Sequence, residues 1–189
     1  MNKRLFSIVA VMLIATMVIS PVSAGGAVKL SGVQFKLGSL IANGFASGLG
    51  STDWILELNA SGHAGVTCTN NGSNDVPGQS SPHVDGKGTQ TLPGGSQITK
   101  NGKAPFNVTA KPEEELNPII SWDAGGCPNP NWTARIDFVY WDAATIFVKD
   151  PVSLATVATY NYNCVTTRTA PNSTPSTFDD GIVSCTLIK

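Results

Sequence analysis

The sequence predicts an all-β protein, an antiparallel β-sandwich of about eight to ten short strands with little or no helix. Apolar and polar residues alternate with a period of two in many short segments, as in half-buried strands. Clusters of Gly, Pro, Asn, Asp and Ser separate these segments and are typical of turns. The four cysteines are an even number, which favours disulfide bonds of the kind that staple exported β domains.

The first part of the chain is expected to form short strands joined by bends. Val33, Phe35 and Leu37 share one face of the first strand, opposite polar residues. A glycine-rich segment around His63 is expected to turn between two later strands. The strands expected here cover residues 28–37, 40–49, 54–59 and 66–69.

The middle of the chain is richer in turn residues. Residues 70–82 have the composition of a loop throughout, and His83 is expected to lie in the same loop. A weak strand over 84–92 and a second strand over 106–110 follow. Segment 111–118, which contains Glu113, Glu114 and Glu115, is the one place in the mature chain that suits a helical turn.

The last part of the chain contains the clearest alternation. In segment 133–141, Ile136, Phe138 and Tyr140 oppose Arg135 and Asp137. Asp142 and Ala143 then predict a tight connection to a strand over 145–149, which would make a hairpin. Two further strands are expected over 156–165 and 182–188, separated by a loop rich in Thr, Ser and Pro.

The N-terminus has the pattern of a secretory signal peptide. Lys3 and Arg4 precede an apolar run over residues 5–19, and Val22-Ser23-Ala24 offers small residues at a cleavage site. Cleavage after residue 24 would leave residues 25–189 as one secreted, extracellular domain. The net charge of −1 for the whole sequence becomes more negative without Lys3 and Arg4, so no nucleic-acid partner is expected. No membrane insertion is expected after cleavage, because the mature part lacks a long apolar run.

The four cysteines are expected to form two disulfides, although the count alone allows three connectivities. We favour Cys68–Cys127 and Cys164–Cys185, the latter because a hairpin of the last two strands would bring these residues together. The competing interpretation is a zinc site. It lacks a C-x-x-C motif and has His63 and His83 as its only histidines, so no metal or cofactor is expected.

The tryptophans are the candidates for ligand stacking. Trp122 and Trp132 flank the Cys127 loop, and Trp141 falls on the face of Arg135 and Asp137, which would direct it outward. These three are possible ligand-stacking residues, whereas Trp54 heads an alternating strand and is expected in the core. Burial is the competing interpretation for each, because tryptophan contributes a large apolar area to a core.

Catalytic and calcium sites have weaker support. His63 and His83 are the only candidate bases for a hydrolase, and neither lies in a G-x-S-x-G context. The run Glu113–Glu115 is a candidate for the paired carboxylates of a glycosidase, but adjacent acids on a polar segment are usually solvated. Asp123 and Asp179-Asp180-Gly181 are candidates for calcium without an EF-hand pattern. No catalytic residue is therefore assigned.

Three motifs resemble a known signature. They are T-C-T-N at Thr67–Asn70, P-G-Q at Pro77–Gln79 and C-P-N-P-N-W-T at Cys127–Thr133. Over residues 28–149 the chain resembles a family of small secreted bacterial β-sandwich proteins of unknown function. The resemblance implies export and an all-β fold, and it brings no catalytic residues.

These observations predict a secreted, non-enzymatic protein that binds an extracellular ligand, either a glycan or a protein. One alternative is a carbohydrate-binding module that uses exposed tryptophans. Another is a small secreted hydrolase with a site that the sequence does not reveal.

Overall fold

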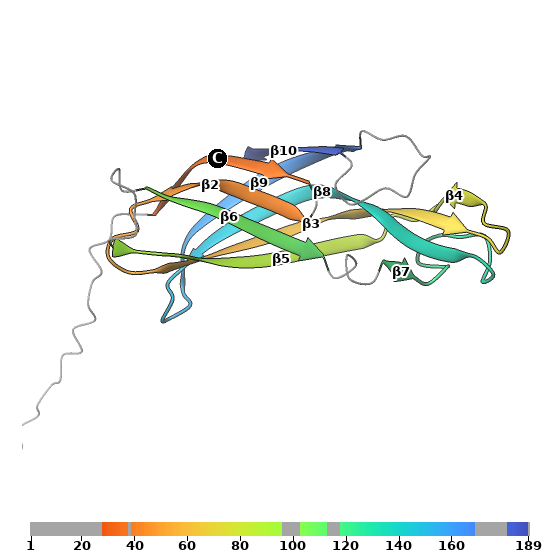
Figure 1. Cartoon of the computed structure of the whole chain (residues 1–189), viewed down its shortest axis with the longest axis horizontal. Coiled ribbons are helices and arrows are strands. Elements are labelled where there is room, and N and C mark those ends of the chain that lie inside the picture. Colours follow the sequence, from red (N-terminus) through yellow and green to blue (C-terminus); the bar gives the residue numbers. More distant parts are fainter. Residues whose placement is uncertain (1–27, 38, 96–102, 113–117, 169–180, 189) are drawn as a thin grey trace, which may run out of the picture.

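The structure, a computed structural model, describes residues 28–37, 39–95, 103–112, 118–168 and 181–188. Within these ranges the protein is all-β, as predicted, and its ten strands form one antiparallel sheet in the order β1-β2-β6-β5-β3-β8-β9-β10 (Figure 1). β4 pairs with β3 and β7 pairs with β8, both outside this path. The strands are β1 Lys29–Lys36, β2 Leu40–Ser47, β3 Trp54–Thr69, β4 Asp75–Pro77, β5 His83–Leu92, β6 Lys103–Pro112, β7 Ile119–Ile120, β8 Thr133–Lys149, β9 Thr156–Arg168 and β10 Gly181–Leu187.

The sheet curls until its two edge strands, β1 and β10, approach each other. The Tyr160 hydroxyl of β9 donates to the Val28 carbonyl at 2.7 Å and accepts from the Leu30 amide at 3.3 Å, which ties β1 to the inner side of β9. Phe35 packs edge-on against Tyr162 in the same place, with ring centroids 4.9 Å apart. The arrangement is thus a nearly closed sheet, and the expected division into two separate sheets of a sandwich is not confirmed.

The core occupies the inside of this curled sheet. Because side chains alternate along each strand, every second residue of β3 points inward. The largest fully buried side chains come from several strands and include Leu40, Leu56, Leu58, Leu92, Trp141 and Ile146. We call the opposite side of the sheet the outer face.

The longest pairing in the sheet joins β3 to β8, and it contains two β-bulges. Ser61 pairs with Ala143 and Gly62 with Trp141, so Asp142 is an extra residue on β8. In the same way Gly65 pairs with Phe138 and Val66 with Ile136, which leaves Asp137 as the second extra residue. β8 therefore runs on through residue 142. The hairpin expected at Asp142-Ala143 was wrong.

The bulges also correct the orientation predicted for Trp141. An extra residue changes the face to which all following side chains point. Residue 134 and Ile136 point inward before the first bulge, and residues 139 and 141 point inward after it. Trp141 is consequently buried, with 1% of its surface exposed, and the expectation that it points outward was wrong.

β3 is likewise one long strand where two short ones were expected. His63 lies in its middle, and the glycine-rich segment around it does not turn. A Cβ at Gly62 would lie 2.1 Å from the Tyr140 carbonyl oxygen, so a residue without a side chain is needed where the bulged strand approaches. Both errors have one cause: glycine and aspartate were interpreted as turns, although here they form a bulge.

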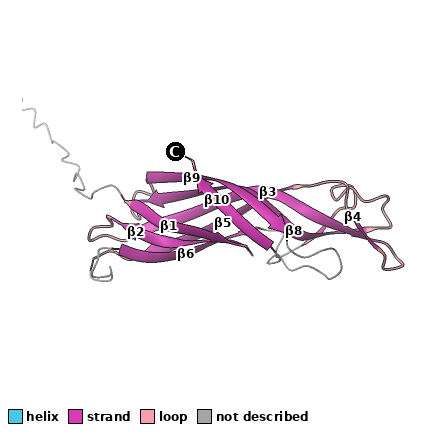
Figure 2. Ribbon diagram, turned by 90° about the horizontal axis from the view of Figure 1, so that it is seen from above, coloured by secondary structure: helices cyan, strands magenta, loops and turns pink. Residues whose placement is uncertain are grey.

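β3 and β8 extend beyond the curled body as a ribbon, visible at the right of both overall views (Figures 1 and 2). β4 and β7 lie along this ribbon, which we call the distal ribbon. The Cys68–Cys127 disulfide joins β3 to the loop before β8 there, with Cα atoms 5.6 Å apart. The second disulfide, Cys164–Cys185, links directly opposite residues of β9 and β10. Both predicted pairings are confirmed.

Several expectations fall outside the described residues. They concern the signal peptide over residues 1–24, the run Glu113–Glu115 and the pair Asp179-Asp180. Lys111 and Pro112, expected to begin a helical turn, belong to β6. No helix in the described ranges is long and apolar enough to cross a membrane.

Candidate functional site

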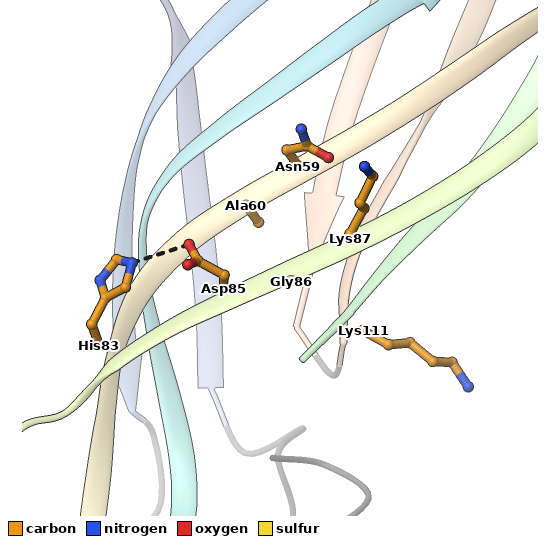
Figure 3. A pocket seen from close by; sticks show the side chains of 7 residues that line it. All are labelled: Asn59, Ala60, His83, Asp85, Gly86, Lys87 and Lys111. Atoms are coloured by element: carbon orange, nitrogen blue, oxygen red, sulfur yellow. Dashed lines mark hydrogen bonds and ion pairs between the residues drawn. The ribbon is translucent and has the colours of Figure 1, made fainter. Parts of the chain in front are cut away.

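The outer face carries an open hollow of about 700 Å³ where β3, β5 and β6 lie side by side (Figure 3). Register explains its composition, since Asn59 of β3 pairs with Lys87 of β5, and Lys87 pairs with Lys111 of β6. Three polar residues from three strands are thereby placed in one row. The residues that line the hollow are Asn59, Ala60, His83, Asp85, Gly86, Lys87 and Lys111.

Beside the hollow, the carboxylate of Glu57 is nearly buried between two lysines. Lys149 of β8 donates to Glu57 Oε2 at 2.8 Å, and Lys87 lies 3.4 Å from Oε1. Burial alone would raise the pKa of Glu57. The hydrogen bond and charge of Lys149, aided by those of Lys87, outweigh burial and lower this pKa below its usual value. Glu57 is therefore a fixed negative charge that holds Lys87 at the hollow's edge.

Asn59 connects this ion-pair network to the hollow. Its side-chain Nδ2 donates to Glu57 Oε1 at 3.3 Å. Its Oδ1 is buried and accepts no hydrogen bond within the part of the chain that the structure describes. An unmet acceptor of this kind is satisfied by a water molecule or by a donor on a ligand.

Lys111 borders the hollow on the β6 side, and Figure 3 shows its side chain extending away from the other labelled residues. No ion pair to Lys111 is formed within the described ranges. The hollow thus offers one lysine held by Glu57, one lysine available to a ligand, and the Asp85 carboxylate.

The two histidines of the chain lie on the same face, and His83 also lines the hollow. His63 of β3 and His83 of β5 are directly opposite each other in the register. His63 Nδ1 lies 2.9 Å from Asp142 Oδ2, and its ring stacks on Tyr140 with centroids 5.1 Å apart. His83 Nε2 lies 3.0 Å from Asp85 Oδ1. Neither histidine is in a loop, so the expected loop positions were wrong.

The structure separates the four tryptophans. Trp54 is in the core, as expected, and its indole N–H donates to the Leu49 carbonyl at 2.6 Å. Trp141 is buried and unavailable for stacking. Trp132 is partly buried against the core, whereas Trp122, on the distal ribbon, is 37% exposed. Of the four, only Trp122 and Trp132 have surface available to a ligand.

The remaining candidates are placed as follows. Asp123 is fully exposed. Hydrogen bonds from the Ser121 side chain and from nearby backbone amides lower the pKa of Asp123. In the described ranges no three or more His, Cys, Asp or Glu side chains are grouped so as to hold a metal ion. All four cysteines are in disulfides, which leaves no thiol for catalysis or metal binding.

Sequence reasoning missed the hollow and the network around Glu57. The alternation in segment 54–59 is a local signal that Glu57 and Asn59 lie on the face opposite Leu56 and Leu58. Lys87 and Lys149 beside Glu57, and Lys111 at the hollow, come from three other strands, and their positions depend on pairings across the sheet.

No protein-family model, curated protein or solved structure matches the chain. The resemblance to small secreted bacterial proteins therefore stays a prediction, and the arguments below depend on the geometry alone.

Proposed function

We propose that the protein is an exported, non-enzymatic binding protein, and that its ligand is an acidic saccharide held in the hollow between β3, β5 and β6. The observation that carries this proposal is that polar residues of three neighbouring strands line one open hollow. Strands joined by backbone hydrogen bonds form a rigid platform, which favours binding without a large cost of ordering.

The chemistry of the lining supports this ligand class. Lysines 87 and 111 supply donors and positive charge for a carboxylate or sulfate group. Asp85 supplies an acceptor for sugar hydroxyls, and the unmet Asn59 Oδ1 accepts one more hydrogen bond. A ligand with many hydroxyls and one negative group satisfies all of these residues.

Other features support binding rather than turnover. The hydrogen-bond partner of each histidine is an aspartate, and no serine hydroxyl is hydrogen-bonded to either ring within the described ranges. Export agrees with the two disulfides, which form and persist in oxidising compartments.

The experiment is a glycan array that contains neutral saccharides together with uronic-acid and sulfated ones. We expect the purified protein to bind acidic members, and Lys111→Ala to lower that binding at least about tenfold by removing one charge-assisted contact. Lys36→Ala is the matched control, because it removes the same charge from β1, three strands away from β5 in the sheet.

Two results would contradict the proposal. One is an array on which no acidic saccharide is bound above the level of Lys111→Ala. The other is release of shortened saccharides by the purified protein, detected by mass spectrometry, because a binding protein leaves its ligand intact.

A further inference from the structure

The two histidines on the outer face lie directly opposite each other on neighbouring strands. In an antiparallel pair, directly opposite residues point to the same face. The Ala64 amide donates to the Pro82 carbonyl at 2.8 Å, so the neighbouring pair, His63 and His83, occupies a position without mutual backbone hydrogen bonds. In such positions the Cα atoms are about 4.5 Å apart and the side chains approach most closely. The two imidazoles therefore start from closely spaced Cα atoms on adjacent strands and on the same face of the sheet.

The aspartates fix which nitrogen of each ring is free. An ionised carboxylate only accepts hydrogen bonds, so the ring nitrogen that faces it must carry the proton. The proton of His63 is therefore on Nδ1 toward Asp142, and the lone pair is on Nε2. The proton of His83 is on Nε2 toward Asp85, and the lone pair is on Nδ1. Carboxylates orient metal-binding histidines in the same way.

The positions of the two aspartates are also set by the sheet. Asp85 lies directly opposite Ser61, two residues before His63 on β3. Asp142 is the extra residue of the bulge that faces the same part of β3 from the other side. The stacked ring of Tyr140 further restricts the His63 imidazole. One carboxylate therefore lies beside each histidine, and together they make the local electrostatic potential more negative.

We propose that His63 and His83 together bind one divalent transition-metal ion of the zinc class, with Asp142 and Asp85 holding the two rings. The described residues contain no preformed group of three ligands, so water molecules complete the coordination. Imidazole nitrogen suits Zn²⁺, Ni²⁺ and Cu²⁺, whereas Ca²⁺ and Mg²⁺ require oxygen ligands. The disulfides leave no thiolate to compete for the ion.

The test is a Zn²⁺ titration of protein that carries no polyhistidine tag, followed by NMR of the imidazole rings. The chain has two histidines, so two sets of ring signals report on the site directly. We expect both sets to move with one common midpoint and to saturate at one equivalent of Zn²⁺. Mg²⁺ at the same concentrations is expected to move neither.

Variants separate chelation from binding at single histidines. His63→Gln is expected to weaken Zn²⁺ binding at His83 at least about tenfold, because the second ligand is no longer held nearby. Asp142→Asn is expected to weaken it by about tenfold through loss of the hydrogen bond that orients His63. Both positions are exposed, and an unchanged unfolding temperature shows that the fold is kept.

The proposal is overturned if the two histidines titrate with different midpoints, if neither moves, or if His63→Gln binds Zn²⁺ as tightly as the unaltered protein. It is also distinguishable from saccharide binding. Lys111→Ala should leave the Zn²⁺ titration unchanged, and His63→Gln should leave saccharide binding unchanged, because residue 63 does not line the hollow.

Discussion

Removal of each disulfide in turn tests how the two parts of the molecule are held together. The perturbations are the double variants Cys68→Ala/Cys127→Ala and Cys164→Ala/Cys185→Ala. The first bond closes a loop of sequence separation 59, and the second a loop of separation 21. The chain-entropy relation then gives losses of about 4 and about 3 kcal/mol in the free energy of unfolding. Loss of the distal bond is expected to cost about 1 kcal/mol more.

The assay is urea unfolding without reductant, followed by tryptophan fluorescence. Alanine keeps the buried sites apolar, so the comparison isolates the cross-link itself. The two losses are read from the midpoints, provided that the slope against urea is the same in both variants. The reasoning is refuted if removal of Cys68–Cys127 costs less than removal of Cys164–Cys185. That order would mean that the distal ribbon opens independently of the body, so that its bond does not restrain global unfolding.

The other predictions concern the ion-pair network and the core. Glu57→Gln is expected to cost about 1–3 kcal/mol in urea unfolding, because Lys149 then lies beside a neutral group. Since folding lowers the pKa of Glu57, its contribution to the free energy of unfolding is present above the usual pKa of a glutamate and is lost as pH falls through the lowered value. The stability of Glu57→Gln should therefore decline less steeply in acid than that of the unaltered protein. An equally steep decline would contradict this. Gly86→Ala is expected to cost about 1–3 kcal/mol, because the new Cβ would lie 2.8 Å from Trp141 Cη2. Thermal unfolding should show partial recovery in Gly86→Ala/Trp141→Phe, and a double variant no more stable than Gly86→Ala would oppose this explanation.

The sequence predicted most strands because alternation is a local property. Segments such as 28–37 and 156–165 have one apolar and one polar face, and this pattern alone identifies a strand with one side in a core. The pairing of Cys164 with Cys185 could be predicted for a similar reason, since consecutive strands usually form a hairpin. Cys68 and Cys127 were favoured correctly as well, and the structure adds that they close the distal ribbon.

Gly62 and Asp142 show why other features could not be predicted. Each was interpreted as part of a turn, yet they face the same bulge from opposite strands. Glycine and aspartate are common in turns, and nothing in the local sequence reveals that two such residues far apart meet in one ladder. Trp141 was given the wrong face for the same reason, because its orientation depends on an extra residue at 137.

The candidate sites depend on long-range register even more strongly. His63 and His83 were identified as the only possible bases, and their aspartate partners were not. Asp142 comes from a strand 79 residues further along the chain. A sequence can name such residues by their chemistry, but only the pairing of β3 with β5 and β8 shows that they face each other.

Each of the two bulges of β8 switches the face of the sheet to which the following side chains point. Deletion of Asp142 alone would move the side chains of residues 143–149 to the opposite face of the sheet. The buried Ile146 and Val148 would then point into water. Loss of Asp137 and Asp142 together would invert only the few residues between them. A deletion of two residues from β8 therefore keeps most side chains on their original face. A deletion of one residue is expected to destabilise the fold more than a deletion of two.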